Sequence, residues 1–401
     1  MRWFLGKEGY YTRVKTRKHV IFLGAGASKG SGYPLANELR LLISSRQHFE
    51  KAITEYEIKH RLTGHPIWTD AKACLDQRSA TLDLFRNGGF ATIDEFCKLA
   101  RGFKLPENIN GLRCLVRAAL GLFNPEEDFH LSEYYGFVQS LFREDLVTLR
   151  EDITILNYNY DPYLEFLLHR ALQHRWRIVG EGRNHHALNS VTSGFHLPNN
   201  HEWLNREKSE AGFCSLKLHG SICYFNQDDP FNHETLFQDG AARRVSLFQH
   251  LGKTHVPPIL FPWEIIGENG FIEQGAFPIS YDASLYPLLI GIWKRARDEV
   301  QTAEKISFVG LSMHSFILDG LKYLFEGKTG EVRIVVANPD NTPFIPGQGE
   351  THWCRLPHSP GFLVSDALGK IAPNLKKHRD EVTLVKDFAA FIKTEMKPFT
   401  R

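Results

Sequence analysis

The chain has 401 residues, of which 42% are hydrophobic and 23% charged, as is usual for a folded globular protein. Its formal net charge of +2 is too small to indicate nucleic-acid binding by itself, and its longest apolar stretch, residues 286–293, is too short to span a membrane. The six cysteines form no C-x-x-C pair, which excludes a four-cysteine zinc site and favours a reducing compartment. The first residues also lack the pattern of a signal peptide. We therefore expect a cytoplasmic protein with no metal, no membrane contact and no feature that argues for nucleic-acid binding.

Short apolar or β-branched runs, each bounded by turn residues, predict buried parallel strands. In chain order they are residues 19–24, 153–158, 175–180, 215–220, 257–262, 305–310 and 332–338. Helical patterns lie between many of them, including residues 141–152 before the second run and residues 293–305 leading into the sixth. Strands that alternate with helices predict an α/β fold, a Rossmann-like doubly wound parallel sheet.

The long gap between the first two runs divides the chain into parts. Helical spacing at Leu112, Leu115, Val116, Ala119 and Phe123 predicts that the gap is a helical insertion over one edge of the sheet. Residues 181–213 and 225–256 are polar and read as long loops of the kind that form lids or binding loops. The predicted division is an N-terminal arm (1–17), a sheet domain (18–45 and 150–345), the insertion (46–149), and a C-terminal segment (346–401). The last segment either finishes the fold or forms an interface, and its helix-like stretch 381–395 favours the first role.

A glycine-rich turn follows the first predicted strand. Gly24, Ala25 and Gly26 end the strand, and a helix is expected from about Pro34, which is the layout that binds the pyrophosphate of a dinucleotide. The dehydrogenase form of the turn would need a glycine where Lys29 stands and an acidic residue about twenty positions later, and the P-loop order Gly-Lys-Ser is missing too. A strand-to-helix turn that merely needs small residues remains the alternative for this stretch alone.

Polar or small residues also follow the later predicted strands. Because the carboxyl ends of parallel strands meet at the edge where open α/β sheets bind ligands, we expect these residues to gather there. Asp161 with Pro162 behind it is also a good helix N-cap, so a structural role stays open for it. The residues at these strand ends are Asn157, Asn159, Asp161, His219, Gly220, Gly310, Ser312 and Asn338.

Taken in order, these stretches resemble the sirtuin-like family. The matching elements are "GAGAS…SGYP" at 24–34, "NYD" at 159–161 with Glu165 behind it, "KLHGS" at 217–221, "GLS" at 310–312 and "NPD" at 338–340. Two features depart from the deacylases of that family: the zinc module with its C-x-x-C pairs is missing, and Tyr158 replaces a glutamine. The resemblance therefore implies the zinc-free prokaryotic branch, whose members hydrolyse NAD, many of them in antiphage defence.

The resemblance also implies roles for the strand-end residues, with NAD as substrate. Neutral nicotinamide needs no general acid when it leaves, so we expect the catalytic residues to orient groups and to activate water or a ribose hydroxyl. Asn159 would hold the ribose hydroxyls or the water, His219 would accept a proton, and Asp161 would orient these groups, stabilise positive charge or cap a helix. The expected NAD-binding residues are Gly24, Ala25, Gly26, Ser28 and Asn157 around the phosphates and turn, Gly32, Tyr33 and Pro34 over the nicotinamide, and Gly310, Ser312 and Asn338 at the adenine-side ribose.

The function expected from the resemblance is that of an NAD glycohydrolase that yields nicotinamide and ADP-ribose and depletes NAD upon phage infection. Such activity must be restrained in a cell, so we expect a homo-oligomer or a regulatory protein partner. Two alternatives stay open: a module that senses NAD or an ADP-ribose derivative without cleaving it, and a zinc-free deacylase or ADP-ribosyltransferase.

Overall fold

The computed structural model describes much of the sheet and its flanking helices. The residues it describes are 3–5, 11–13, 18–59, 76, 78–90, 93–102, 106–122, 129–144, 149–168, 170–171, 213–222, 259–261, 264, 266–267, 270–271, 285–311, 315–337, 369, 383–385 and 387–396. The predicted strand at 175–180 lies outside these residues, as does nearly all of the predicted loops at 181–213 and 225–256.

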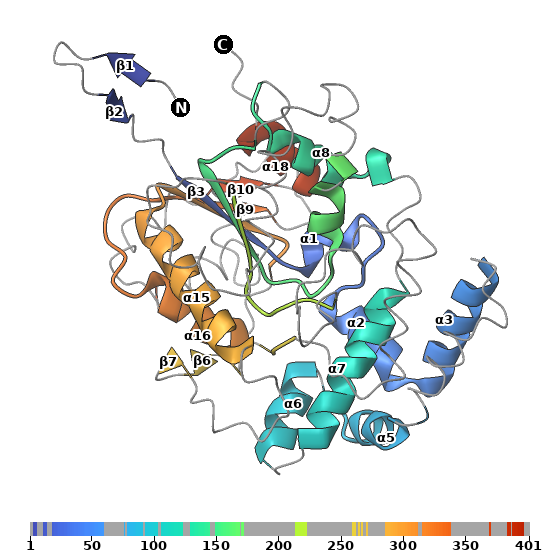
Figure 1. Cartoon of the computed structure of the whole chain (residues 1–401). Helices are drawn as coiled ribbons and strands as arrows, with labels where there is room; N and C mark the ends of the chain where they lie inside the picture. The colour runs from blue at the N-terminus through green and yellow to red at the C-terminus, as the bar shows by residue number, and fades with distance from the viewer. Residues whose placement is uncertain are drawn as a thin grey trace, which may run out of the picture.

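A six-stranded sheet forms the centre of the molecule, with the strand order β10-β9-β8-β3-β4-β5 (Figure 1). Every neighbouring pair is parallel. Read from β5, the sheet has the doubly wound order 3-2-1-4-5-6, so the predicted Rossmann-like α/β fold is confirmed. Its strands are β3 (His19–Leu23), β4 (Ile153–Asn157), β5 (Cys214–Lys217), β8 (Lys305–Val309), β9 (Arg333–Ala337) and β10 (Thr383–Val385).

The register of the central strands fixes which residues share the carboxyl edge. Leu23, the last residue of β3, pairs with Asn157 on β4 and with Val309 on β8. The chain segments that leave these three strands therefore start side by side. The strand order reverses between β3 and β8, which makes this the position where doubly wound sheets bind ligands.

Alternating side chains of the strands pack into two apolar clusters, one on each face of the sheet. Val20 and Phe22 of β3 face the cluster that includes α15 (Leu285–Thr302) and α16 (Ser315–Phe325). Ile21 and Leu23 face the opposite cluster. Period-two alternation of buried residues is how a parallel sheet covered on both faces is built.

The opposite cluster joins the sheet to the helices that precede β4. Figure 1 shows α8 and α18 together at the top of the view and α2, α3, α5, α6 and α7 as a second group at the lower right, and all of these helices contribute buried residues to this cluster. The buried Leu112, Leu115, Val116 and Ala119 lie on α7, as their spacing predicted, whereas Phe123 lies outside the described residues. The elements on this side are α1 (Ala25–Lys29), α2 (Ala36–Ser44), α3 (Arg46–Lys59), α5 (Ser79–Asn87), α6 (Ile93–Gly102), α7 (Pro106–Gly121), η1 (Phe129–Leu131), α8 (Glu133–Ser140) and α18 (Phe388–Glu395).

The predicted helix at 141–152 is wrong. Helix α8 ends at Ser140, and Phe142 forms an isolated antiparallel bridge with Leu149. Both side chains are buried, so the apolar positions that suggested a helix are satisfied by this bridge between described residues at the two ends of the stretch.

Three other boundaries also differ from the prediction. Of the predicted strand at 257–262, the described residues 259–261 do not join the parallel sheet, because Ile259 forms an isolated antiparallel bridge with Gly220 beyond the end of β5. The helix-like stretch 381–395 begins as β10 and becomes helical only after Asp387, whose side chain caps α18. The glycine turn leads directly into the short helix α1, and the helix expected from about Pro34 begins at Ala36.

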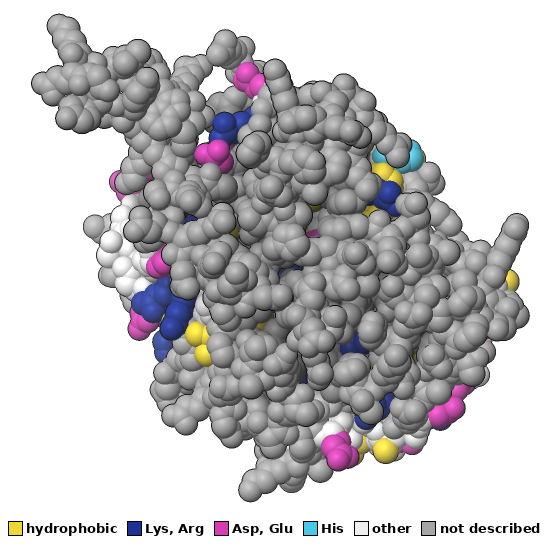
Figure 2. All heavy atoms as spheres, in the orientation of Figure 1, with side chains coloured by type: hydrophobic (Ala, Val, Ile, Leu, Met, Phe, Trp, Pro, Cys, Tyr) yellow, Lys and Arg dark blue, Asp and Glu magenta, His cyan; other side chains and the backbone are white. Residues whose placement is uncertain are grey.

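Two small antiparallel pairs complete the described strands. They are β1 (Trp3–Leu5) with β2 (Tyr11–Arg13), drawn apart from the sheet in Figure 1, and β6 (Ile266–Gly267) with β7 (Gly270–Phe271). Within the described part of the chain, no helix combines the length and apolar character needed to cross a membrane. On the described surface in Figure 2, basic and acidic side chains lie near one another instead of gathering by sign, in keeping with the small net charge.

Candidate functional site

The turn after β3 and the turn after β8 touch backbone to backbone. A Cβ atom on Gly24 would lie 2.5 Å from the Gly310 carbonyl oxygen, and a Cβ on Gly310 would lie 2.2 Å from the Ala27 amide nitrogen. Gly310 also has a φ of +60°, which favours glycine. The Gly26 N–H donates to the Gly310 carbonyl at 2.9 Å, which closes the contact. The close packing of the two turns therefore requires glycine at positions 24 and 310, whether or not a ligand binds there.

The turn after β4 is built by asparagine and aspartate side chains. The Asn157 Oδ1 accepts the Asn159 amide N–H at 2.9 Å, and the Asp161 Oδ1 accepts the Tyr163 N–H at 3.0 Å. The second contact caps the helical residues 163–168, as the sequence suggested for Asp161. Asn157, Asn159 and Asp161 are all buried. Hydrogen bonds within this segment therefore hold the turn, and contacts with other strands add to them.

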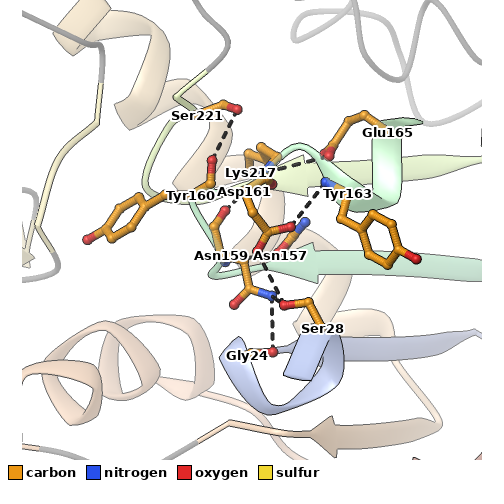
Figure 3. A network of polar contacts seen from close by, with 10 residues as sticks. All are labelled: Gly24, Ser28, Asn157, Asn159, Tyr160, Asp161, Tyr163, Glu165, Lys217 and Ser221. Atoms are coloured by element: carbon orange, nitrogen blue, oxygen red, sulfur yellow. Dashed lines mark hydrogen bonds and ion pairs between the residues drawn. The ribbon is translucent and has the colours of Figure 1, made fainter. Parts of the chain in front are cut away.

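Contacts with the glycine turn attach this segment to β3. The Asn159 Nδ2 donates to the Gly24 carbonyl at 3.0 Å, and Ser28 Oγ lies 3.4 Å from the same nitrogen. The Ser28 hydroxyl lies 3.3 Å from both the Ala25 carbonyl and Asp161 Oδ2, so it donates to one of these two acceptors. Figure 3 shows Asn159, Ser28 and Gly24 converging, with the side-chain oxygen of Asn159 pointing away from both partners.

Lys217, the last residue of β5, reaches the same turn from the other side. Its ammonium donates to the main-chain carbonyls of Asn159, at 2.9 Å, and of Asp161. It also forms an ion pair of 3.7 Å with Glu165 Oε2, and both side chains are buried (Figure 3). Reasoning from the sequence missed Lys217. The available signal was a lysine inside an apolar strand, since charged side chains are almost never fully buried without a partner.

Burial raises the pKa of both acidic groups in this cluster. Desolvation raises the pKa of Glu165 to about 7, although the charge of Lys217 opposes the shift. Desolvation also raises the pKa of Asp161, against the Lys217 charge and the hydrogen bonds from Tyr163 and Ser28. Neither carboxylate oxygen of Glu165 has a hydrogen-bond partner in the described part of the chain.

His219 follows β5 and is only 2% exposed. Its ring lies among aromatic rings, with centroid distances of 5.1 Å to Tyr158, 5.6 Å to Trp293 and 6.3 Å to Tyr160. Tyr158 and Tyr160 flank Asn159 in the sequence, so His219 lies beside the turn after β4. Neither ring nitrogen has a hydrogen-bond partner among the described residues. Desolvation lowers the pKa of His219 to about 3, with a weaker opposing effect from the Leu260 backbone, so the ring is neutral near pH 7.

The remaining candidate residues fall into two sets. The Tyr33 ring is buried and lies 5.4 Å from the Tyr163 ring, while Gly32 has a φ of +91° and Pro34 is partly buried. This segment therefore lies beside the capped turn after β4. Ser312 and Asn338, expected at the adenine-side ribose, lie outside the described residues.

The structure thus brings most of the sequence candidates to the carboxyl edge of β3, β4 and β5. The described residues at this edge present amide and hydroxyl groups, a neutral imidazole, two buried carboxyl groups and the Lys217 ammonium, which donates to main-chain carbonyls. These groups can orient hydroxyls and water and can hold a positive charge. Among the described residues, no three His, Cys, Asp or Glu side chains are grouped as a metal centre requires.

Comparisons with known proteins add nothing to this geometry. Neither a scan against models of protein families nor a search of curated proteins finds a match for the chain.

Proposed function

We propose that this protein is an NAD glycohydrolase that cleaves the bond between nicotinamide and ribose, giving nicotinamide and ADP-ribose. One observation supports the proposal above the others. The Asn159 amide after β4 is fixed against the Gly24 carbonyl after β3, next to the point where the strand order reverses, and it lies beside His219 after β5. The order of the motifs along the chain, which resembles the sirtuin-like NAD hydrolases, agrees with this placement.

The reaction needs little covalent chemistry from the protein. The glycosidic bond breaks, neutral nicotinamide leaves with the bonding electrons, and water adds to ribose carbon one and releases a proton. Positive charge develops on the sugar, so the protein can accelerate the reaction by orienting the reacting groups and by placing negative or dipolar groups near the sugar. The Asn159 oxygen, which points away from its partners, suits a ribose hydroxyl or the attacking water (Figure 3). Asp161 and Glu165 add buried acidic groups beside it.

His219 would act as an uncharged acceptor in this scheme. With a pKa near 3, the imidazole is neutral at pH 7, and its unprotonated nitrogen, which has no partner among the described residues, can accept a hydrogen bond from a ribose hydroxyl or water. An imidazole with so low a pKa is a weak general base. This observation favours a second candidate function, a module that binds NAD or an ADP-ribose derivative and does not cleave it.

The wider setting follows from the same resemblance. We propose a cytoplasmic effector that depletes NAD upon phage infection and whose activity a homo-oligomer or a regulatory protein partner restrains until then. A zinc-free deacylase or ADP-ribosyltransferase would also bind NAD at this edge, but none of the contacts described above favours it.

The test is nicotinamide release from NAD by the purified full-length protein, measured by chromatography. We expect release by the wild type and a loss of at least about 100-fold in His219→Ala and Asn159→Ala. The control is His19→Ala, because His19 is also buried but lies at the amino end of β3, where it contacts Ser307 at 2.7 Å. Release that is equal in all four proteins would refute the proposed site. Binding of NAD without release would favour the second candidate.

A further inference from the structure

Lys217 is unusual among the buried side chains near the candidate site, because its partners are mainly backbone atoms of the functional turn. The ammonium group has three hydrogens. The carbonyls of Asn159 and Asp161 accept from it, and the Glu165 carboxylate lies 3.7 Å away on its remaining side. We infer that Lys217 is a positioning residue for the proposed reaction: it holds the backbone of the turn that carries Asn159 and Asp161, with Glu165 as its counter-ion. The inference rests on the proposed NAD cleavage for its catalytic meaning.

The turn is held between the two neighbouring strands. From the β3 side, the Gly24 carbonyl accepts from the Asn159 side chain. From the β5 side, Lys217 binds the Asn159 carbonyl. With both contacts present, the main chain and the side chain of Asn159 are fixed independently. If Lys217 were removed, two buried carbonyls would each lose a charged donor, and the turn would shift to find new partners. A displacement of about 1 Å in a reacting group is sufficient to reduce the rate about 100-fold.

Stability gives a weaker explanation for this cluster than positioning does. Placing an ammonium and a carboxylate in the interior has a desolvation cost that their attraction offsets only in part, and apolar replacement of buried ion pairs is often neutral or stabilising. The ion pair here is longer than a hydrogen bond, and the Glu165 oxygens have no hydrogen-bond donor in the described residues. The strong contacts of Lys217 are those to the turn.

The same chain provides a matched control. Lys328 is also buried, and its ammonium also donates to two main-chain carbonyls, those of Gln301 at 3.0 Å and Ala303 at 2.8 Å. These carbonyls lie where α15 leads into the amino end of β8, away from the candidate site. Replacing Lys328 therefore removes an equivalent backbone contact without touching the turn after β4.

The experiment compares the full-length wild type with Lys217→Met, with the charge-balanced double variant Lys217→Met/Glu165→Gln, and with Lys328→Met. One readout is kcat and KM for nicotinamide release. The other, which does not depend on NAD cleavage, is hydrogen–deuterium exchange of the peptide that spans residues 157–163. We expect both Lys217 variants to exchange faster in this peptide and to lose about 30- to 100-fold in kcat, with KM changed less than about threefold. Lys328→Met should match the wild type in both readouts.

Each result separates the inference from the function on which it rests. Exchange in residues 157–163 that stays at the wild-type rate in the double variant would overturn the positioning role, whether or not NAD is cleaved. Faster exchange with unchanged kcat would overturn its catalytic meaning. Faster exchange in a protein whose wild type releases no nicotinamide would refute the proposed function and leave the structural role of Lys217 intact. An equal loss of kcat in Lys328→Met would show a general effect of buried lysines and would also overturn the inference.

Discussion

Gly310→Ala should damage the protein far more than a glycine replacement at positive φ normally does. An alanine at the φ of +60° costs about 1 kcal/mol in the left-handed region. Its Cβ would also lie 2.2 Å from the Ala27 nitrogen and 2.5 Å from the Gly26 carbonyl carbon, and both are main-chain atoms that no side-chain rotation can move. Overpacking of this kind adds about 1–3 kcal/mol. We therefore expect the free energy of unfolding to fall by about 2–4 kcal/mol.

Gly327→Ala is the control for the backbone conformation alone. Gly327 has a φ of +77°, and a Cβ added there meets nothing within 4 Å, so its replacement should lose only about 1 kcal/mol. Urea unfolding with matched m-values gives both losses. If the two variants lose the same amount, the close approach of the two turns does not constrain the structure, and the argument for bare backbone at the reversal point fails. Gly310→Ala should in addition abolish the thermal stabilisation that NAD is expected to give the wild type.

Three further predictions concern buried charges and a helix cap. Because burial raises the pKa of Glu165 to about 7, the native state binds more protons than the unfolded state above the ordinary pKa of 4.5. The contribution of Glu165 to the free energy of unfolding should thus fall by up to about 3 kcal/mol as the pH rises from 5 to 8, and the difference between the wild type and Glu165→Gln in urea unfolding should change by this amount over the range; a difference that does not vary with pH would refute the assignment. Arg113→Met leaves the buried Glu264 carboxylate without its guanidinium partner and should cost about 3–5 kcal/mol, most of which a second change, Glu264→Gln, should recover. Asp387→Ala removes the acceptor for the Ala390 N–H at 2.8 Å and should cost about 1 kcal/mol in thermal unfolding, whereas Asp387→Asn should cost less.

The central strands could be predicted because their sequence and their environment agree. Every residue of β3 is buried, as a continuous apolar run predicts for a strand covered on both faces. The prediction failed where only tertiary packing decides the outcome. Strand β10 has three residues and precedes a strong helical pattern, so its pairing with β9 cannot be recognised locally. The same holds for Phe142 and Leu149, whose spacing fits a helix as well as the observed bridge.

The candidate site shows a similar division. The sequence identified Asn159, Asp161 and His219 because parallel topology collects strand ends at one edge, and the order of the motifs along the chain is readable. A lysine inside an apolar strand marked Lys217 as unusual, but the sequence could not show its role, since the partners of this side chain are main-chain atoms of the turn after β4. Nor could it show that Gly310 lies too close to the turn after β3 to carry a side chain, because that contact joins segments far apart in the chain.

Two buried glutamates differ in the number of partners that their carboxylates have, and this difference distinguishes the candidate site. Glu299, on α15, has both oxygens engaged: Arg295 lies 2.8 Å from one, while Lys18 and Thr154 lie 3.0 Å and 3.1 Å from the other. Glu165 is buried to a similar degree, yet among the described residues it has only the 3.7 Å ion pair to Lys217. Among the described residues, a buried carboxylate is satisfied at one edge of the sheet and another has no hydrogen-bond donor at the opposite edge, which is not the arrangement that stability alone favours. Unsatisfied polar groups at the carboxyl edge of a parallel sheet are expected where a ligand completes the hydrogen bonding. This local departure from optimal stability therefore favours the carboxyl edge of β3, β4 and β5 as the place where the protein acts.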